Sequence, residues 1–216
     1  MPDPVPLPTT RRGQQTRAAL VAAAAEVFAE KQFLDTNVSD IARRAGTAHG
    51  TFYRYFNSKE EIFREVALDL ERKMRAHREA DEQRDPPPFE RKEDELIWRI
   101  TRANRRYLAA YQEYAALFAV IEQVATFNDE LREIRKEIRR GFVDSARASI
   151  ERMQREGLAF DDIDARYAAS ALGSMVDRFA YVWLVLGEEF ELEEAARTLG
   201  LLWARSLGIG LQPKSP

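Results

Sequence analysis

The sequence predicts an all-α protein of about nine helices, with a small N-terminal helical domain followed by a larger helical C-terminal domain. Two observations support this fold class. Apolar residues recur at the three- and four-residue spacing of amphipathic helices, and no stretch alternates apolar and polar residues as a half-buried strand does. Three consecutive prolines at 86–88 form the clearest break after the first domain.

The composition is that of a soluble globular protein, with 45% hydrophobic and 32% charged residues among 216. The chain has no cysteine, which excludes disulfides and thiolate metal sites. We find neither a membrane-length apolar run nor a signal-peptide pattern, so we expect a cytoplasmic protein with no membrane partner. Residues 1–59 hold eight Lys or Arg against five Asp or Glu, whereas the rest of the chain is acidic. This polarity is typical of a protein that meets phosphate at one end only.

The first elements follow from composition and periodicity. Residues 1–8 contain four prolines and are expected to be a disordered lead. An alanine-rich amphipathic helix is predicted from about Gly13 to Lys31, followed by a break at 32–35. Thr36 or Asn37 is the expected N-cap of a second helix that ends at Ala45, before the turn at Gly46.

The next segment is short and unusual. A helix from Ala48 or His49 to Phe56 carries aromatic and basic side chains that suit phosphate and base-edge contact better than a protein core. We interpret residues 37–56 as a helix-turn-helix inside a DNA-binding domain that covers 9–58. Ser58 and Glu61 then have the spacing of a capping box, which predicts a long helix to about residue 80.

Residues 59–216 are expected to form one further domain, because the helical pattern continues to the end of the chain. Further helices are predicted over 89–110, 112–126, 128–155, 162–186 and 192–207. Asn128 and either Asp161 or Asp162 have the character of N-caps, and Gly157 and Gly187 that of C-terminal stops.

Residues from about 16 to 67 resemble the tetracycline-repressor (TetR) family of bacterial transcription regulators. The resemblance rests on this ordered series: Ala23 with Phe28-Ala29, Thr36-Asn37-Val38-Ser39-Asp40-Ile41-Ala42, Ala45-Gly46, Gly50-Thr51-Phe52-Tyr53-Arg54-Tyr55-Phe56 and Ser58-Lys59-Glu60. It implies three N-terminal helices on a double-stranded DNA operator, a helical body that binds a small-molecule effector, and a homodimer. Gln32 stands where the family usually has glycine, and Ala48 where it usually has a capping serine.

The resemblance also implies which residues meet DNA, with the first turn of the third helix in the major groove. The expected contacts are Thr36, Thr47, Ala48, His49, Gly50, Thr51, Tyr53, Arg54, Tyr55 and Lys59. Glycine at 50 allows the backbone to approach a phosphate, and Lys59 begins a helix whose N-terminus attracts anions. For Tyr55, a DNA contact and partial burial in the core remain equal alternatives.

The C-terminal domain holds more large aromatics than a tight helical core needs, which leaves room for the aromatic-lined cavity that the resemblance implies. The candidate ligand-binding residues are Trp98, Tyr107, Tyr111, Phe118, Phe127, Phe142, Met175, Phe179 and Trp183. Candidate polar anchors are Arg102, Asn104, Arg106, Gln123, Ser174 and Asp177. For any single residue, ordinary core packing remains the alternative.

The last two helices are apolar around much of their circumference, so something has to cover them on more than one side. The resemblance implies that they pair with their copies in a second chain. The candidate dimer-interface residues are Leu172, Val176, Val182, Leu199, Leu202 and Trp203. The alternative is that they form a monomeric core.

We therefore expect a DNA-binding transcriptional regulator, a repressor that a small, largely apolar ligand releases from its operator. The alternative is a dimeric helical small-molecule-binding protein that does not bind an operator. An enzyme is not expected, because the chain has only two histidines and no nucleophile motif, metal-ligand cluster or phosphate loop. The sequence accordingly predicts no cofactor and no metal.

Overall fold

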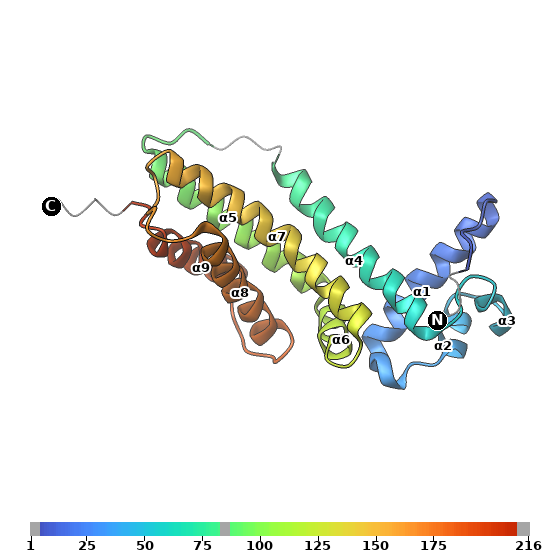
Figure 1. Ribbon diagram of the computed structural model, residues 1–216. Coiled ribbons are helices and arrows are strands. Elements are labelled where there is room, and N and C mark those ends of the chain that lie inside the picture. Colours follow the sequence, from blue (N-terminus) through green and yellow to red (C-terminus); the bar gives the residue numbers. More distant parts are fainter. Residues whose placement is uncertain (1–4, 83–86, 211–216) are drawn as a thin grey trace. The chain divides into compact units, whose positions relative to one another are not determined.

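A computed structural model describes residues 5–82 and 87–210 of the protein. Over these residues it contains nine α-helices and no strand, which confirms the predicted all-α fold (Figure 1). The helices are α1 (Arg11–Asp35), α2 (Val38–Arg44), α3 (His49–Phe52), α4 (Lys59–Glu82), α5 (Lys92–Glu113), α6 (Ala115–Ala125), α7 (Asp129–Arg155), α8 (Ala165–Leu184) and α9 (Leu192–Ser206). No helix in the described ranges is both long enough and apolar enough to cross a membrane.

The chain divides into two compact units. The first consists of the chain through Arg72 together with Ala116–Glu137, and the second of Lys73–Ala115 together with the chain from Ile138. This division differs from the sequence-based boundary at residue 58, because α6 and the first parts of α4 and α7 group with the helix-turn-helix. Helices α4 and α7 each contribute residues to both units.

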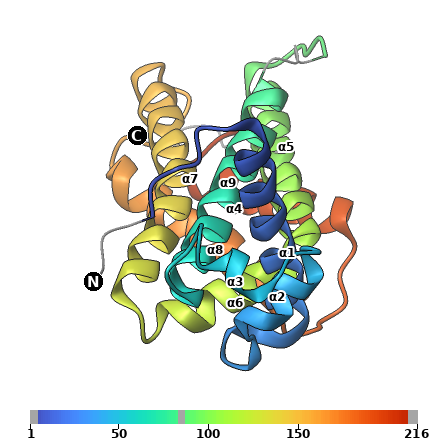
Figure 2. The same ribbon diagram turned by 90° about the vertical axis from the view of Figure 1, so that its right-hand side faces the viewer.

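The first unit is held together by a cluster of phenylalanine rings. The ring centre of Phe63 on α4 lies 4.8 Å from that of Phe28 on α1 and 5.0 Å from that of Phe33. Phe127, which follows α6, lies 6.3 Å from Phe33, and Arg64 on α4 pairs with Glu130 on α7 at 2.9 Å. Helix α1, the first part of α4, the segment after α6 and the start of α7 therefore contact one another in the first unit, whose helices are drawn in Figures 1 and 2.

The helix ends in this unit follow local chemistry. Gln32 interrupts α1 with φ 64° and ψ 171°, which confirms the predicted break and makes Gln32 the one non-glycine residue with positive φ in the described ranges. Gly46 has φ 65°, as the predicted turn requires. The capping box also forms, since the Glu61 N–H donates to Ser58 Oγ at 3.1 Å and the Glu61 carboxylate accepts from the Asn57 N–H.

Several predicted boundaries shift. The α-helical part of α3 spans only four residues, and the chain continues to Phe56 in turns, with the Phe56 N–H donating to the Phe52 carbonyl at 3.1 Å. Helix α8 begins three residues later than predicted, because the cap is Asp164 and neither Asp161 nor Asp162. The predicted cap at Asn128 is confirmed by a 3.0 Å hydrogen bond from the Leu131 N–H to Oδ1. The predicted stops at 157 and 187 are also confirmed, because both glycines have positive φ.

The beginning of the chain is described from residue 5, so residues 1–4 of the expected disordered lead lie outside the described part. Pro8 contacts the start of α1, where its carbonyl accepts a hydrogen bond from the Gln14 side-chain amide at 3.3 Å. Thr10 caps α1, with its hydroxyl oxygen accepting from the Gly13 N–H at 3.2 Å. The helix therefore starts two residues earlier than its apolar stripe indicates.

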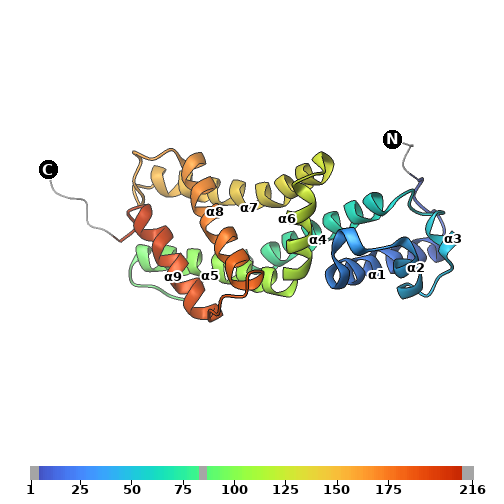
Figure 3. The same ribbon diagram turned by 90° about the horizontal axis from the view of Figure 1, so that it is seen from below.

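In the second unit, α8 and α9 lie across α5 and the later part of α7 (Figure 3). Helix α9 approaches α5 very closely at Gly200, where an added Cβ would lie 2.9 Å from the Thr101 Cα atom. Helix α7 meets α5 through Phe142 and Tyr107, whose ring centres are 4.9 Å apart. The Tyr107 hydroxyl also donates to Asp177 on α8. These contacts join α5 to α7, α8 and α9 in the second unit.

Candidate DNA interface and ligand pocket

Two buried phenylalanines orient the third helix of the first unit. Phe52, at the end of α3, and Phe56, just after it, are both fully buried, with their ring centres 5.7 Å apart. Ile41 on α2 is equally buried. Because one side of the 49–56 segment is committed to the core, the opposite side is presented to solvent.

That outward side carries hydrogen-bond donors. His49, Gly50 and Arg54 are exposed, and Tyr53 is 50% exposed with its ring edge-on to His49 at 5.4 Å between ring centres. Thr51 and Tyr55 are half-buried. A Cβ built on Gly50 would meet no atom within 4 Å, so the packing of the free protein does not require glycine there.

Most other cations of the first unit serve as links between helices. Arg44 on α2 pairs with Glu26 at 2.9 Å and Glu30 at 2.6 Å on α1, and its hydrogen bond lowers the pKa of Glu30. Lys31 on α1 pairs with Asp40 on α2 at 2.7 Å and lowers the pKa of that carboxyl. We call these five residues the α1–α2 ion-pair clamp.

The cations that remain are few and lie at the surface. Within residues 5–82, Arg11, Arg12 and Arg54 are exposed and form no ion pair. Arg17, by contrast, pairs with Glu65 at 2.9 Å. Arg54 is thus an exposed cation beside α3 that forms no ion pair within the described residues.

The start of α3 has no side-chain cap. Ala48 occupies the N-cap position with extended backbone angles, φ −68° and ψ 148°. The Thr47 hydroxyl, the alternative cap, donates instead to the Ala42 carbonyl at 3.3 Å. Thr47 therefore supports the turn after α2, and Ala48 leaves the surface at the start of α3 without a side-chain hydroxyl.

Two residues expected at the DNA surface have their side-chain polar groups engaged inside the first unit. Thr36 is 1% exposed, and its hydroxyl donates to the Gln32 carbonyl at 2.7 Å. The Lys59 ammonium group donates to the carbonyls of Phe33 at 2.8 Å and Thr36 at 3.0 Å. Both side chains stabilise the connection between α1 and α2, which leaves neither directed at a phosphate.

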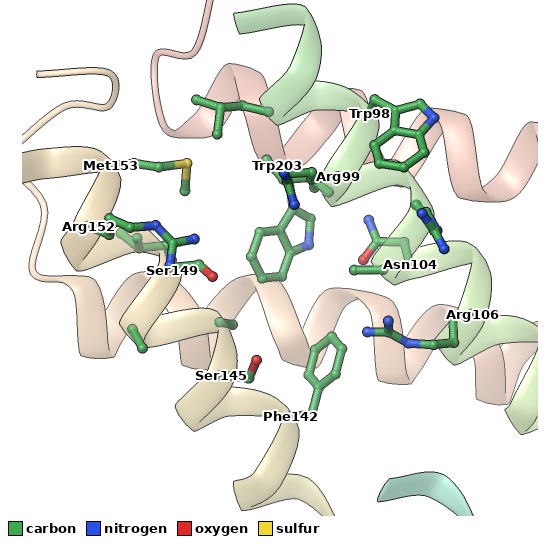
Figure 4. Close-up of a pocket in the computed structure, with 17 residues that line it drawn as sticks. Trp98, Arg99, Asn104, Arg106, Phe142, Ser145, Ser149, Arg152, Met153 and Trp203 are labelled. Atoms are coloured by element: carbon green, nitrogen blue, oxygen red, sulfur yellow. The ribbon is translucent and has the colours of Figure 1, made fainter. Parts of the chain in front are cut away.

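The second unit contains a pocket of about 460 Å³ between α5, α7 and α9 (Figure 4). This volume is within the range of small-molecule sites. Its lining residues are Leu96, Trp98, Arg99, Ile100, Arg102, Ala103, Asn104, Arg106, Phe142, Ser145, Ala146, Ala148, Ser149, Ile150, Arg152, Met153 and Trp203. The lining is therefore mixed, with aromatic and aliphatic surfaces beside four arginines.

Nine residues were candidates for ligand binding. Two of them, Trp98 and Phe142, line this pocket. Tyr107 packs on Phe142 outside it, and Tyr111 is a buried core residue. The remaining candidates lie elsewhere: Phe118 and Phe127 are in the first unit, and Met175, Phe179 and Trp183 are on α8 away from the pocket lining. Aromatic content did not separate core packing from pocket lining, because both environments favour the same side chains.

Among the candidate polar anchors, those on α5 identified pocket-lining residues better than the aromatic candidates did. Arg102, Asn104 and Arg106 all line the pocket. Ser174 instead accepts from Arg139 at 2.7 Å. Asp177 accepts from the Tyr107 hydroxyl, and Gln123 belongs to the first unit.

Sequence reasoning missed the α7 wall of the pocket. Ser145, Ser149, Arg152 and Met153 line it together with Phe142. Their spacing of three and four residues places them on one helix face, which is the signal that could have identified them. The high density of charged residues along α7 concealed this face.

The candidate dimer interface also needs correction. Trp203 is 5% exposed and lines the pocket, and Val176 and Leu199 are buried inside the second unit, so none of the three offers a surface to a second chain. Leu172 and Val182 are half-buried. Leu202 on α9 is 44% exposed.

The described residues contain no group of three or more His, Cys, Asp or Glu placed to hold a metal ion. In the part of the chain that the structure describes, the candidate sites considered are an exposed helical surface in the first unit and a mixed pocket in the second. Neither brings together a nucleophile and a general base, so the arrangement suits recognition and not group transfer.

Comparison with known proteins agrees with this description. Residues 20–66 match the family model of bacterial regulatory proteins of the tetR family. The chain is 27% identical over 191 residues to the HTH-type transcriptional regulator TtgR of Pseudomonas putida. The aligned region covers 85% of this chain and 87% of that protein. The chain is also 25% identical over 180 residues to the fatty acid metabolism regulator protein of Bacillus subtilis, which covers 80% and 86%.

The fold is also that of solved regulators. The crystal structure of the transcriptional regulator FadR from Bacillus subtilis in complex with stearoyl-CoA aligns with a TM-score of 0.67 at 21% identity, covering 86% of this chain and 96% of that one. Family model, curated relatives and fold point to the same kind of protein. Residues 20–66 form a DNA-binding domain of the tetR family, and the chain is a DNA-binding transcriptional regulator similar to these relatives over most of its length.

Proposed function

We propose that the protein is a homodimeric repressor that acts on DNA in the cytoplasm and leaves its operator when a small molecule occupies the pocket of the second unit. The observation that carries this proposal is the segment 49–56. Phe52 and Phe56 fix it in the core, and His49, Tyr53 and Arg54 face outward. A rigid helix end with exposed donors is what readout in a major groove requires.

The proposed contacts divide by chemistry. Gly50, Thr51 and Tyr53 supply backbone and hydroxyl donors for phosphates, which fix position but carry no sequence information. His49 and Arg54 supply donors that distinguish base edges, arginine being the usual partner of guanine. Ala48, Tyr55 and Thr47 complete the surface. Thr36 and Lys59 are omitted because their polar groups are engaged within the first unit.

A second copy of the chain is proposed to cover the outer side of α8 and α9. Large apolar side chains remain exposed there, with Tyr167 on α8 at 72% and Leu202 on α9 at 44%. Exposed large apolar side chains on these two helices favour an isologous dimer. Two helix-turn-helix units about 34–36 Å apart then reach successive major grooves on one face of DNA.

Coupling between pocket and DNA is proposed to run through α7 and α4. Helix α7 supplies one wall of the pocket, and its first residues belong to the same compact unit as the helix-turn-helix. Arg64 on α4 pairs with Glu130 on α7 in that unit. A ligand that favours one arrangement of α7 by about 1–3 kcal/mol changes operator affinity about 5–150-fold. The relative crystallised with stearoyl-CoA supports regulation by a small molecule.

The test is a footprint on the DNA upstream of the protein's own coding region, repeated over a range of salt concentrations. We expect a protected site with two half-sites and an affinity that falls steeply with salt. His49→Ala is expected to relax sequence preference, with a cost of about 1–3 kcal/mol at its base pair. Arg147→Ala on α7 is the matched control and leaves the footprint unchanged.

A chain that binds small molecules but protects no DNA sequence at any salt concentration contradicts this proposal. That outcome favours the alternative function, a dimeric helical binding protein without an operator. A footprint that small molecules never weaken contradicts the regulatory part alone.

A further inference from the structure

Two hydrogen-bond donors in the pocket are buried and have no partner. The side-chain Nδ2 of Asn104 on α5 and the indole Nε1 of Trp203 on α9 are both inaccessible and unbonded. Asn104 is 2% exposed and Trp203 5% exposed. Both residues line the same pocket, and Figure 4 shows Trp203 in its middle with Asn104 at its side.

Such donors are rare in folded proteins, since roughly 90% or more of buried polar groups are hydrogen-bonded. The indole N–H can only donate, so its missing partner is an acceptor atom. The unpaired amide N–H of Asn104 is also a donor and likewise requires an acceptor atom. Two unpaired donors at one pocket therefore indicate a ligand that carries hydrogen-bond acceptors, typically oxygens.

The charged side chains that line the pocket are all basic. Four arginines line the pocket, at positions 99, 102, 106 and 152, and no Asp or Glu is among the lining residues. Glu95 neutralises part of this charge from outside, through a 2.8 Å ion pair with Arg99. The guanidinium of Arg102 lies 4.8 Å from the centre of the Trp98 ring. Arginine is the side chain best suited to bind carboxylate and phosphate oxygens.

Apart from Ser145 and Ser149, the other lining residues are apolar. Trp98 on α5, Phe142 on α7 and Met153 on α7 contribute its larger hydrophobic surfaces. A purely polar ion would leave these surfaces unmatched, and a purely apolar molecule would leave Asn104 and Trp203 unpaired. The occupant that fits both halves is amphipathic.

We propose that this pocket binds an organic anion, with its oxygen-bearing head group at Asn104 and Trp203 and its apolar body against Trp98, Phe142 and Met153. The arginines balance the charge of the head group. This inference deepens the proposed function, because it names the chemical class of the effector. It also replaces the expectation of a largely apolar ligand.

The test uses three eight-carbon probes that share the same apolar chain: octanoate, 1-octanol and octylammonium. Binding to the full-length protein is measured by calorimetry. We expect octanoate to bind at least about tenfold more tightly than octanol, and octylammonium not to bind, because only the carboxylate accepts from both donors and meets the arginines.

Two variants assign the donors. Trp203→Phe keeps an aromatic ring but removes Nε1, and Asn104→Leu removes the amide. Each is expected to weaken octanoate binding about fivefold to tenfold without changing the affinity for octanol. Trp183→Phe is the matched control, because Trp183 is also buried, at 9% exposed, but lies on α8 outside the pocket.

A second pair of variants tests the charge while leaving the buried core untouched. Arg152→Gln is expected to weaken octanoate binding, whereas Arg147→Gln, on the same helix but outside the lining, is not. Thermal melting of each variant establishes that it is folded. If Trp203→Phe or Asn104→Leu fails to fold, the Arg152→Gln and Arg147→Gln variants and the three probes still test whether the pocket binds an anion.

The proposal is overturned if octanoate and octanol bind equally, if octanoate does not bind at millimolar concentration, or if Trp203→Phe and Arg152→Gln both bind octanoate like the parent. Operator binding is measured separately in the presence of each probe. Anion binding that leaves the operator complex intact contradicts the regulatory function and spares the pocket assignment. If octanol and octanoate release DNA equally well, the regulatory function stands and the assignment of the pocket to an anion is contradicted.

Discussion

The ammonium nitrogen of Lys59 lies 2.8 Å from the carbonyl oxygen of Phe33 and 4.5 Å from the centre of the same residue's ring. A second carbonyl, of Thr36, accepts from it at 3.0 Å. These carbonyls follow the break in α1, so the first residue of α4 ties down the connection between α1 and α2. A cation near the C-terminal end of a helix is also favoured by the helix dipole.

Lys59→Met is therefore expected to destabilise the protein more than it affects DNA contact. The substitution keeps the aliphatic stem but removes the ammonium donor from the partly buried carbonyls of Phe33 and Thr36, which costs about 1–3 kcal/mol in the free energy of unfolding. Urea denaturation measures this loss. The salt dependence of operator binding is expected to stay the same, and a decrease of about one in its slope would contradict the structural role. Arg54→Met is the matched comparison and is expected to give the opposite pattern.

Gln32→Gly is expected to stabilise the protein. The backbone of Gln32, with φ 64° and ψ 171°, occupies a region open almost only to glycine, which costs about 1–3 kcal/mol. Glycine removes this strain but adds entropy to the unfolded chain, so we expect a net gain of about 1 kcal/mol. The measurement is the urea midpoint, with Gln32→Ala as the control that keeps the strain. A lower midpoint for the glycine variant would show that the backbone is unstrained.

Gly50→Ala separates folding from DNA contact. An added methyl group meets open space in the free protein and improves helix propensity, so stability is expected to rise by about 0.5–1 kcal/mol. Operator affinity is expected to fall, because the methyl group prevents close approach of the backbone to a phosphate. Gel-shift titration beside thermal melting checks both expectations. If affinity is unchanged, Gly50 does not face DNA.

The α1–α2 ion-pair clamp predicts a pH dependence. Hydrogen bonds from Arg44 lower the pKa of Glu30 below its ordinary value of 4.5, and those from Lys31 lower the pKa of Asp40 below 3.8. Because the folded pKa values are the lower ones, the clamp stabilises the protein fully above about pH 4.5 and loses this contribution as the pH falls through the folded values.

Arg44→Gln is expected to melt at a lower temperature than the parent at about pH 7, and the gap is expected to shrink at about pH 3.5. All of these side chains reach solvent, so high salt is expected to reduce the gap as well. Arg147→Gln, which leaves the clamp intact, is the control. A gap that does not change with pH would show that Arg44 acts through packing and not through charge.

Gly200→Ala is expected to loosen the second unit. A Cβ at this position would lie 2.2 Å from the Thr101 Oγ1 atom and 2.9 Å from its Cα, and the backbone atom cannot move without separating α9 from α5. Overpacking of this kind costs about 1–3 kcal/mol, which differential scanning calorimetry would measure. Gly50→Ala serves as the control for a glycine with free space. Thr101→Ala combined with Gly200→Ala is expected to recover part of the loss.

The features that could be predicted from the sequence are those with local causes. Helix periodicity, the capping box at Ser58 and Glu61, and the glycine turn at Gly46 each depend on residues close together in the chain. The helix-turn-helix is built from such features, so its motif and its family were predictable. The DNA-contact residues that remain exposed, such as His49 and Arg54, stay predictions until an operator complex is measured.

Other features depend on which helices meet in space. Lys59 and Thr36 carry residue types suited to a phosphate, but the break at Gln32 brings carbonyls to them and engages them internally. Trp203 has the spacing of an outward apolar stripe, yet the close approach of α9 to α5 at Gly200 turns it into the pocket. The sequence by itself determined the helices, the turn and the family, because these follow from local spacing. Only the tertiary structure decided which polar groups are engaged and which are left open to a ligand, because that depends on contacts between residues far apart in the chain.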